Sequence, residues 1–213
     1  GFPAFFSEEY FMVDKRKFKD TNISLLGLGT MRLPCETEEK RESNPNIDYG
    51  KAQSLVDLAY KNGVNYFDTA YMYHCGKSEA FIGCALNKYP RDTYFIADKL
   101  PIWLCDTKED MKLVFDEQLE RTGMDYFDFY LLHSLDNENF EKCEKFDAYD
   151  FLKKMQKEGK IKYIGFSFHG TVDDLRNIVS AHKWDFAQIQ MNYLDWENQN
   201  AKMQYQILED AGI

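Results

Sequence analysis

The chain has 213 residues, of which 44% are hydrophobic and 16% aromatic, so it can bury one sizeable core without disulfides or metals. Its 36 acidic and 26 basic side chains give a formal charge of -10 with no acidic tail, which argues against nucleic acid and anionic membranes as partners. Five dispersed cysteines form no Cys-x-x-Cys pair, and no segment has the roughly 18 apolar residues of a membrane helix. These features predict a single-domain cytoplasmic protein with reduced thiols.

Residues 1–11 form an extension of unclear origin ahead of the recognisable pattern. They include the apolar side chains Phe2, Phe5 and Phe6 but lack the basic start and small-residue cleavage site of a signal peptide. Met12 is a candidate natural start, and we assign residues 12–213 to one domain.

Short apolar runs alternate with longer amphipathic runs along this domain, a pattern typical of repeated βα units. The predicted strands are 24–29, 66–68, 94–99, 127–133, 163–167 and 187–192. The predicted helices are 51–62, 78–88, 108–122, 148–157, 172–181 and 201–211. Glycines that can adopt positive φ follow four of these helices, at Gly63, Gly123, Gly159 and Gly212.

Polar residues stand at or just after the ends of successive predicted strands. They are Asp68, Lys99, His133 and Ser167, with Gln188 and Asn192 in the sixth strand. The first four are 31, 34 and 34 residues apart. A closed (β/α)8 TIM barrel has about 31 residues per unit, and the carboxyl ends of its strands meet on one face. We therefore predict a barrel of this α/β class in which these side chains converge.

Six strand–helix units are two fewer than such a barrel contains. We therefore expect an incomplete barrel of about six of eight units, truncated at its C-terminus. A natural six-unit open sheet is the alternative, although its seam would leave unpaired strand edges and a half-covered apolar interior.

The segment 65–73, Asn-Tyr-Phe-Asp-Thr-Ala-Tyr-Met-Tyr, is followed by Gly76, Ser78 and Glu79 and resembles the aldo-keto reductases. The resemblance covers about 15–213 and includes 26–32, 98–99, 131–133 and 159–167. It implies an NAD(P)-dependent oxidoreductase that reduces an aldehyde or ketone to an alcohol by hydride transfer from NAD(P)H. The expected partner is a small-molecule carbonyl substrate.

The resemblance implies four catalytic residues, Asp68, Tyr73, Lys99 and His133. Carbonyl reduction needs a proton on oxygen as well as a hydride on carbon, and Tyr73 is the expected proton donor. A nearby Lys99 ammonium should lower the phenol pKa by about 1–3. Asp68 should keep the lysine charged, and His133 should hydrogen-bond the substrate carbonyl.

The same resemblance implies a set of cofactor contacts: Gly29, Thr30, Met31, Asp68, Ser167 and Gln188. The usual preference of the family favours NADP(H) over NAD(H), and the absence of Gly-x-Gly-x-x-Gly argues against a Rossmann dehydrogenase. Phe168 follows Ser167 where the family commonly has Asn. The run 165–169 resembles a bacterial branch that often carries a C-terminal iron-sulfur segment, which we expect only in a longer parent chain.

Several other side chains are candidates for the walls of the substrate pocket. His74 follows Tyr73 directly and His169 follows the fifth predicted strand, whereas His182 is expected at the surface. Aromatic wall candidates are Tyr71, Trp103 and Trp196, for each of which ordinary packing is the alternative.

Three other functions fit parts of the pattern. A metal-dependent barrel hydrolase or isomerase would use Asp68, His133, His169 and Glu79 as ligands, but the usual local pairing of histidines is missing. A non-catalytic cofactor-binding barrel would retain the same residues. An inactive fragment of a longer enzyme is the third alternative.

Overall fold

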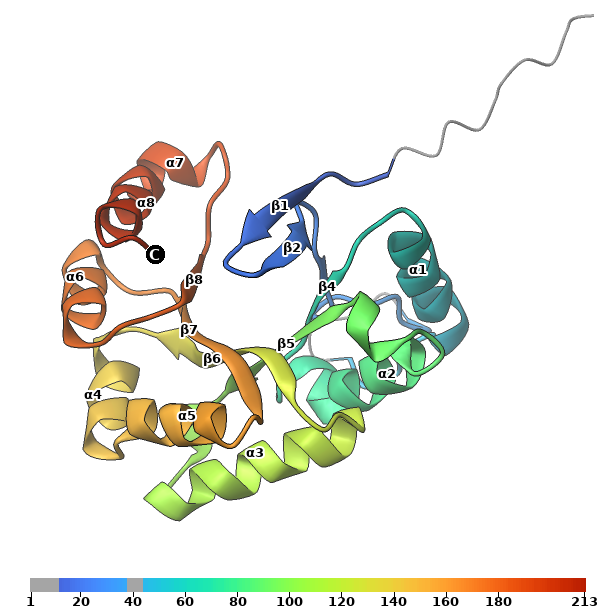
Figure 1. The fold of residues 1–213 in the computed structure, drawn as a ribbon, viewed down its shortest axis with the longest axis horizontal. Coiled ribbons are helices and arrows are strands. Elements are labelled where there is room, and N and C mark those ends of the chain that lie inside the picture. The colour runs from blue at the N-terminus through green and yellow to red at the C-terminus, as the bar shows by residue number, and fades with distance from the viewer. Residues whose placement is uncertain (1–11, 38–43) are drawn as a thin grey trace, which may run out of the picture.

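A parallel sheet of six strands dominates the computed structural model, which describes residues 12–37 and 44–213 (Figure 1). The strands are paired in chain order, from β3 at one end of the sheet to β8 at the other. Their bounds are β3 (Leu28–Gly29), β4 (Tyr66–Asp68), β5 (Phe95–Leu100), β6 (Phe127–Leu135), β7 (Ile161–Phe168) and β8 (Phe186–Ile189). The predicted parallel α/β barrel arrangement is confirmed, with six strands among the described residues. The expected extension 1–11 lies outside them.

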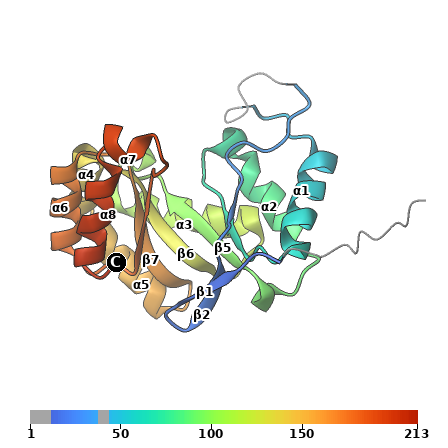
Figure 2. The same cartoon turned by 90° about the horizontal axis from the view of Figure 1, so that it is seen from above.

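Helices follow the strands and surround the outer face of the sheet (Figures 1 and 2). They are α1 (Tyr49–Lys61), α2 (Lys77–Leu86), α3 (Lys108–Thr122), α5 (Ala148–Lys157), α6 (Val172–Ala181) and α8 (Ala201–Asp210). Each matches a predicted helix to within two residues at either end. The four predicted terminating glycines all have positive φ, between 65° and 92°. Among the described residues no helix is both long and apolar enough to cross a membrane.

Short additional elements were not predicted. They are α4 (Asn137–Lys145), α7 (Asp195–Asn198), η2 (Tyr73–Gly76), η3 (Arg91–Thr93) and η4 (Ile102–Leu104). Helix α4 is short, strongly polar and buries only Cys143, so its sequence contains little apolar material that would mark a helix. Its start is fixed locally, because the Asp136 side chain accepts a hydrogen bond of 2.8 Å from the backbone N–H of Asn139.

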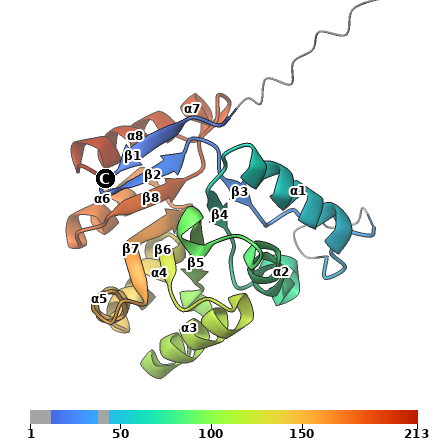
Figure 3. The same cartoon turned by 45° about the vertical axis from the view of Figure 1, so that its right-hand side comes forward.

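The predicted first strand, 24–29, is divided in the structure. Its first residue ends β2 (Thr21–Ser24), which pairs antiparallel with β1 (Lys15–Phe18), and only Leu28–Gly29 joins the parallel sheet. The hairpin lies beside β8 in Figure 3. Lys19 bonds Asp185, and the Tyr163 hydroxyl donates to Asp20, so the hairpin is tied to the far end of the sheet.

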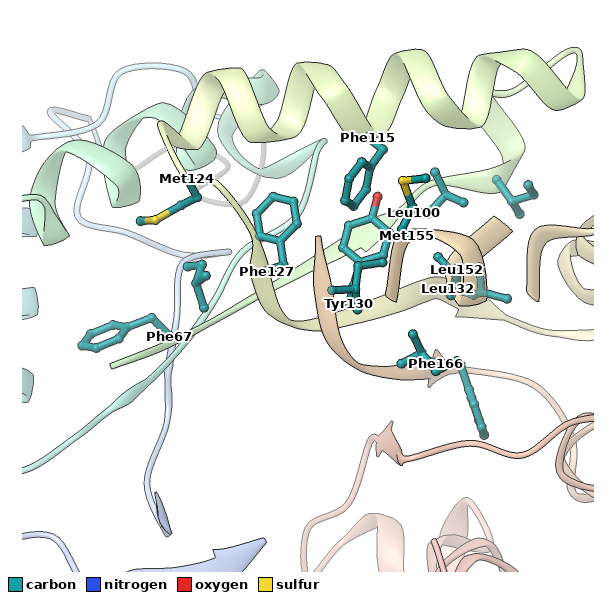
Figure 4. Packing of buried hydrophobic residues seen from close by; sticks show 14 of the residues in the cluster. Phe67, Leu100, Phe115, Met124, Phe127, Tyr130, Leu132, Leu152, Met155 and Phe166 are labelled. Carbon is teal, nitrogen blue, oxygen red and sulfur yellow. The ribbon is translucent and has the colours of Figure 1, made fainter. Parts of the chain in front are cut away.

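Alternation along β6 divides the core into two layers. Phe129 and Leu131 point to the inner face, where Phe129 lies 5.6 Å from the ring of Phe18 on the hairpin. Tyr130 and Leu132 point outward to the helices. Figure 4 shows this outer layer, in which Phe115 of α3 packs against Tyr130 with ring centroids 5.0 Å apart. The inner layer is aromatic and lies beneath the strand ends described below.

Helix α3 begins and ends on local signals. Thr107 and Asp110 form a reciprocal capping box at its start, and Gly123 closes it with φ of 65°. This places Thr122 against Gly83 of α2, where an added Cβ would lie 2.0 Å from the Thr122 carbonyl oxygen. The absent side chain therefore sets how closely the two helices approach.

We predict that Gly83→Ala lowers the free energy of unfolding by about 1–3 kcal/mol or more, because α2 and α3 must separate to admit the methyl group. Gly50→Ala is the matched control, since its nearest non-neighbouring atom is 3.6 Å away and alanine favours the helix. Urea unfolding of both variants measures the difference, and equal stabilities would contradict the packing argument.

Candidate active site

The strand register brings the predicted polar residues to one end of the inner face. Asp68 on β4 is paired with Ala97, two residues before Lys99 on β5. Lys99 is in turn paired with Leu131, two residues before His133 on β6. Side chains two residues apart on a strand share a face, so all three polar side chains point into the barrel at its carboxyl end.

Lys99 is the most deeply buried charged group of this site, with 1% of its surface exposed. Its Nζ donates to Asp68 Oδ1 at 2.7 Å and to the Thr69 carbonyl oxygen at 2.5 Å. Burial lowers the pKa of Lys99, but Asp68 and the other acidic neighbours outweigh it, so the pKa lies above its ordinary value. The lysine is therefore an ammonium at neutral pH.

Tyr73 lies on η2, directly beside this ammonium. Lys99 Nζ is 5.0 Å from the centroid of the Tyr73 ring. Burial raises the pKa of the Tyr73 phenol, Lys99 lowers it and Asp68 raises it, and the net direction is upward. Lys99 therefore lowers the phenol pKa as expected, but desolvation outweighs the ammonium in the protein alone. Tyr73 is fully protonated at neutral pH.

His133 faces Tyr73 at the end of β6. Their ring centroids are 6.1 Å apart with an interplanar angle of 83°. A register shift between Leu132 and Leu135 places Ser134 at φ of 54° and turns the strand end at this point. Burial, Lys99 and His169 together lower the pKa of His133 to about 3, so the imidazole is neutral. Its buried Nδ1 has no hydrogen-bond partner among the described residues.

His74, a pocket candidate from the sequence, is instead a core residue. It is fully buried, and its Nε2 accepts from the Leu33 N–H at 3.0 Å. Its Nδ1 lies 2.7 Å from the Asn44 carbonyl oxygen, which makes Nδ1 the protonated nitrogen. Both ring nitrogens are used to hold the loop after β3. His169 is exposed and His182 is half-buried against Glu144.

Buried hydroxyl groups fix the ends of β3 and β4. Ser78 Oγ at the start of α2 lies 2.6 Å from Thr30 Oγ1 and 2.9 Å from Thr69 Oγ1. Thr30 Oγ1 donates to the Asp68 carbonyl oxygen at 2.9 Å. Thr30 was predicted to contact the cofactor, but its side chain is wholly buried in this cluster. Sequence analysis included Ser78 only as part of a motif and did not identify this role.

The other predicted cofactor positions lie at the same end of the sheet, where Met31 and Gln188 are exposed and Ser167 is buried. Apart from its chain neighbours, Gly29 has no atom within 4 Å of where a Cβ would stand, and Met31 is 37% exposed. Ser167 Oγ accepts from the Ser134 N–H at 2.7 Å, which leaves its hydroxyl proton available to a ligand. Gln188 is exposed on the neighbouring strand, paired with Ser167. The unobstructed backbone at Gly29 and the polar groups of Ser167 and Gln188 therefore fit a flat amide-bearing ring.

Only one of the three aromatic wall candidates lies against the site. The Trp103 ring is 5.1 Å from His133 and is 37% exposed. Tyr71 instead donates to Glu117 and stacks on Arg121, and Trp196 packs against Tyr205. Trp103 is therefore the aromatic side of the space above His133.

The alternative metal site does not assemble. Glu79 bonds Gln118 and Arg121 on the helix side of β5, whereas Asp68 bonds Lys99 on the inner side. Across 12–37 and 44–213, no three His, Cys, Asp or Glu side chains are placed to share a metal ion.

We predict that Asp68→Asn lowers the free energy of unfolding by about 3–5 kcal/mol, because it leaves the buried Lys99 charge without its anion. Asp116→Asn on the exposed pair with Lys112 is the control and should cost less than about 1 kcal/mol. Denaturant unfolding at neutral pH separates them. Similar losses in both variants would mean that Lys99 does not depend on Asp68.

We also predict that stability falls by up to about 1.4 kcal/mol per pH unit as pH drops from 6.5 toward 3 because of His133 alone. The unfolded imidazole takes up a proton in this range while the folded one resists it, so the contribution is complete above pH 6.5. His133→Gln should lose less stability on acidification than the unaltered chain. If the free energy of unfolding in urea changed equally with pH in His133→Gln and in the unaltered chain, this would contradict a neutral imidazole in the folded protein.

Comparison with known proteins agrees with this geometry. The model of the aldo/keto reductase family matches residues 25–213. A probable aldo-keto reductase 1 of Glycine max is 29% identical over 176 residues, covering 79% of this chain and 48% of that protein. An aldo-keto reductase of Gibberella moniliformis is 30% identical, covering 83% and 53%. The chain thus spans about half the length of these curated relatives.

A solved structure shows the same fold. The aldo-keto reductase AKR11C1 of Bacillus halodurans superimposes with a TM-score of 0.73 at 24% identity, covering 94% of this chain and 64% of that one. The family match extends over most of the chain and includes every strand of the parallel sheet together with Asp68, Tyr73, Lys99 and His133. This protein belongs to the aldo/keto reductase family.

Proposed function

We propose that this protein reduces an aldehyde or ketone to an alcohol with NAD(P)H, and that Tyr73 donates the proton. The observation that carries the proposal is the arrangement around Lys99. An ammonium held by Asp68 lies under the Tyr73 ring, and a neutral His133 faces the same phenol. The nicotinamide, when bound, supplies the hydride.

Each side chain has one task in this reaction. The protonated Tyr73 phenol gives its proton to the substrate oxygen, and the neutral His133 donates a hydrogen bond to the same oxygen. The lowered pKa of His133 keeps its imidazole neutral, so it acts as a hydrogen-bond donor and Tyr73 remains the acid. Asp68 and the Thr69 carbonyl oxygen hold the ammonium where it can attract the phenolate.

The Lys99 ammonium lowers the free-energy cost of ionising Tyr73. A phenol with an ordinary pKa near 10 costs about 4 kcal/mol to ionise at pH 7, and burial increases the cost. Lys99 is the only cation among the causes that lower the Tyr73 pKa. Its attraction offsets part of the cost at the moment of proton transfer, when the phenolate appears.

The cofactor would be held by the predicted positions at the strand ends. Gly29 and Met31 would lie along one side of the nicotinamide, and Ser167 and Gln188 would hydrogen-bond its amide. We favour NADP(H) over NAD(H), in line with a silkworm aldo-keto reductase whose structure was solved in complex with NADP. A relative from Escherichia coli, 27% identical, is named an NADH-specific methylglyoxal reductase, so the test below includes both cofactors.

Two further features bear on the type of substrate and on the cellular compartment. Trp103 gives the space above His133 an aromatic side, which favours a carbonyl compound with an apolar substituent. None of the five cysteines forms a disulfide in the described part of the chain, which is consistent with a reducing compartment, and we place the protein in the cytoplasm.

We predict that Tyr73→Phe lowers kcat for carbonyl reduction by about 10²–10⁴-fold while cofactor binding is retained, because only the proton donor is removed. Tyr71→Phe is the matched control, since that hydroxyl bonds Glu117 on the outer side and should leave turnover unchanged. Turnover of a panel of aldehydes, followed by cofactor absorbance, measures both. Equal kcat in Tyr73→Phe and the unaltered chain would remove Tyr73 from this role.

Quenching of tryptophan fluorescence by NADPH and by NADH tests the cofactor separately. Trp103 beside His133 should report nicotinamide binding, and tighter quenching by NADPH would support the stated preference. Saturable quenching without turnover of any carbonyl would favour the non-catalytic cofactor-binding barrel. Neither quenching nor turnover in a folded chain would indicate that the 213 residues are an inactive fragment.

A further inference from the structure

Two acidic side chains lie behind Lys99, on the helix side of β5, and the proposed reaction does not use them. Asp98 precedes Lys99 on the strand, and Glu79 reaches it from α2. Both are completely buried. Because successive residues on a strand point to opposite faces, Asp98 points away from the site that Lys99 enters.

A single amide nitrogen connects these acids to the lysine backbone. Gln118 Nε2 on α3 is 2.9 Å from Glu79 Oε1, 2.9 Å from Asp98 Oδ1 and 3.0 Å from the Lys99 carbonyl oxygen. Tyr130 donates its hydroxyl proton to Gln118 Oε1, which fixes the amide so that its nitrogen faces the acids. The Lys99 N–H also donates to Asp98 Oδ1 at 2.8 Å. Both main-chain polar groups of Lys99 are thereby bonded to this cluster.

The charges of the cluster do not balance if both acids are ionised. Arg121 is the cation that faces it, at 3.0 Å from Glu79 Oε2, and it is shared with the more exposed Glu117. Lys99 is already engaged by Asp68 on the other face. The remaining groups that face Asp98 are uncharged or acidic: Gln118, Tyr130 and Glu79. Two buried carboxyl groups that share one site cannot readily both ionise.

Asp98 also has an oxygen that could carry the proton. Asp98 Oδ2 is buried and has no hydrogen-bond donor among the described residues. An acceptor left without a donor in the core is costly, whereas a protonated oxygen can itself donate to Glu79. Burial and Glu79 raise the pKa of Asp98 well above its ordinary value, in agreement with the geometry.

We propose that Asp98 is protonated, donates its proton to Glu79, and with Gln118 positions the main chain of Lys99, so that these side chains act on carbonyl reduction through the lysine. The inference rests on the proposed function for the role of Lys99. Asp98, Glu79 and Gln118 are positioning residues, because none of them contacts the space between Tyr73 and His133. Two measurements on the 213-residue chain test it, and neither requires turnover.

The first measurement compares the pH dependence of unfolding in Asp98→Asn and the unaltered chain. Asparagine keeps the acceptor for the Lys99 N–H and supplies a neutral donor toward Glu79. Above the ordinary aspartate pKa of 3.8 the unfolded Asp98 ionises while the folded one keeps its proton, so the unaltered chain loses stability relative to the variant as pH rises. The ratio of their unfolding equilibrium constants should change by about tenfold per pH unit from about pH 5 to the pH at which the folded Asp98 itself ionises.

Asp128→Asn is the matched control, a second buried strand aspartate that faces Arg91 and Lys162. It should destabilise the chain throughout the pH range, because it leaves two cations without their anion. If Asp98→Asn behaves in the same way, with a loss that does not change with pH, then Asp98 is ionised in the folded protein and the proposal is overturned.

The second measurement follows the ammonium resonance of Lys99 by heteronuclear NMR, identified as the signal absent from Lys99→Met. Asp98→Ala should displace or broaden this resonance, and Asp98→Asn should restore it. An unchanged resonance in Asp98→Ala would overturn the positioning role. Absence of carbonyl reduction in the unaltered chain would count against the proposed function but would leave both readouts of the acid pair intact.

Discussion

The buried ion pair between Lys99 and Asp68 is the interaction on which the rest of the site depends. An ammonium with 1% exposure persists only because a carboxylate at 2.7 Å and a carbonyl oxygen at 2.5 Å replace its water. The same charge helps to keep His133 neutral and opposes the effect of burial on Tyr73. Burial is the largest cause of both pKa shifts, and this one cation acts on both neighbours, so the site requires it to be rigid.

Rigidity comes from both faces of β5. On the inner face Asp68 is held by the staggered strand register and by the Thr30 hydroxyl, which bonds its carbonyl oxygen. On the outer face the main chain of Lys99 is bonded to Asp98 and Gln118. The close approach of α2 and α3 at Gly83 keeps the outer groups packed together. Helix packing far from the substrate space is in this way connected to the position of one nitrogen atom.

Sequence analysis succeeded where the signal is local or periodic. The alternation of strands and helices follows from apolar spacing, and the convergence of Asp68, Lys99 and His133 follows from their places at strand ends. It failed where burial in the folded protein determines the role or the pKa of a residue. The short, polar helix α4 buries a single residue, His74 became a core residue through partners far along the chain, and the direction of the Tyr73 pKa depends on how deeply the ring is buried. Gln118 gave no signal, because its role exists only when three elements meet.

The hairpin of β1 and β2 has a consequence for how the chain folds as it is synthesised. Its two ties to the sheet join residues 143 and 166 positions apart, Asp20 to Tyr163 and Lys19 to Asp185. At ordinary translation rates the hairpin therefore waits roughly 10–30 s for its partners to emerge, with Phe18 exposed meanwhile. Such long-range closure makes this step slow and leaves the nascent chain open to chaperones and to aggregation. The aromatic inner layer can be completed only near the end of synthesis of these 213 residues.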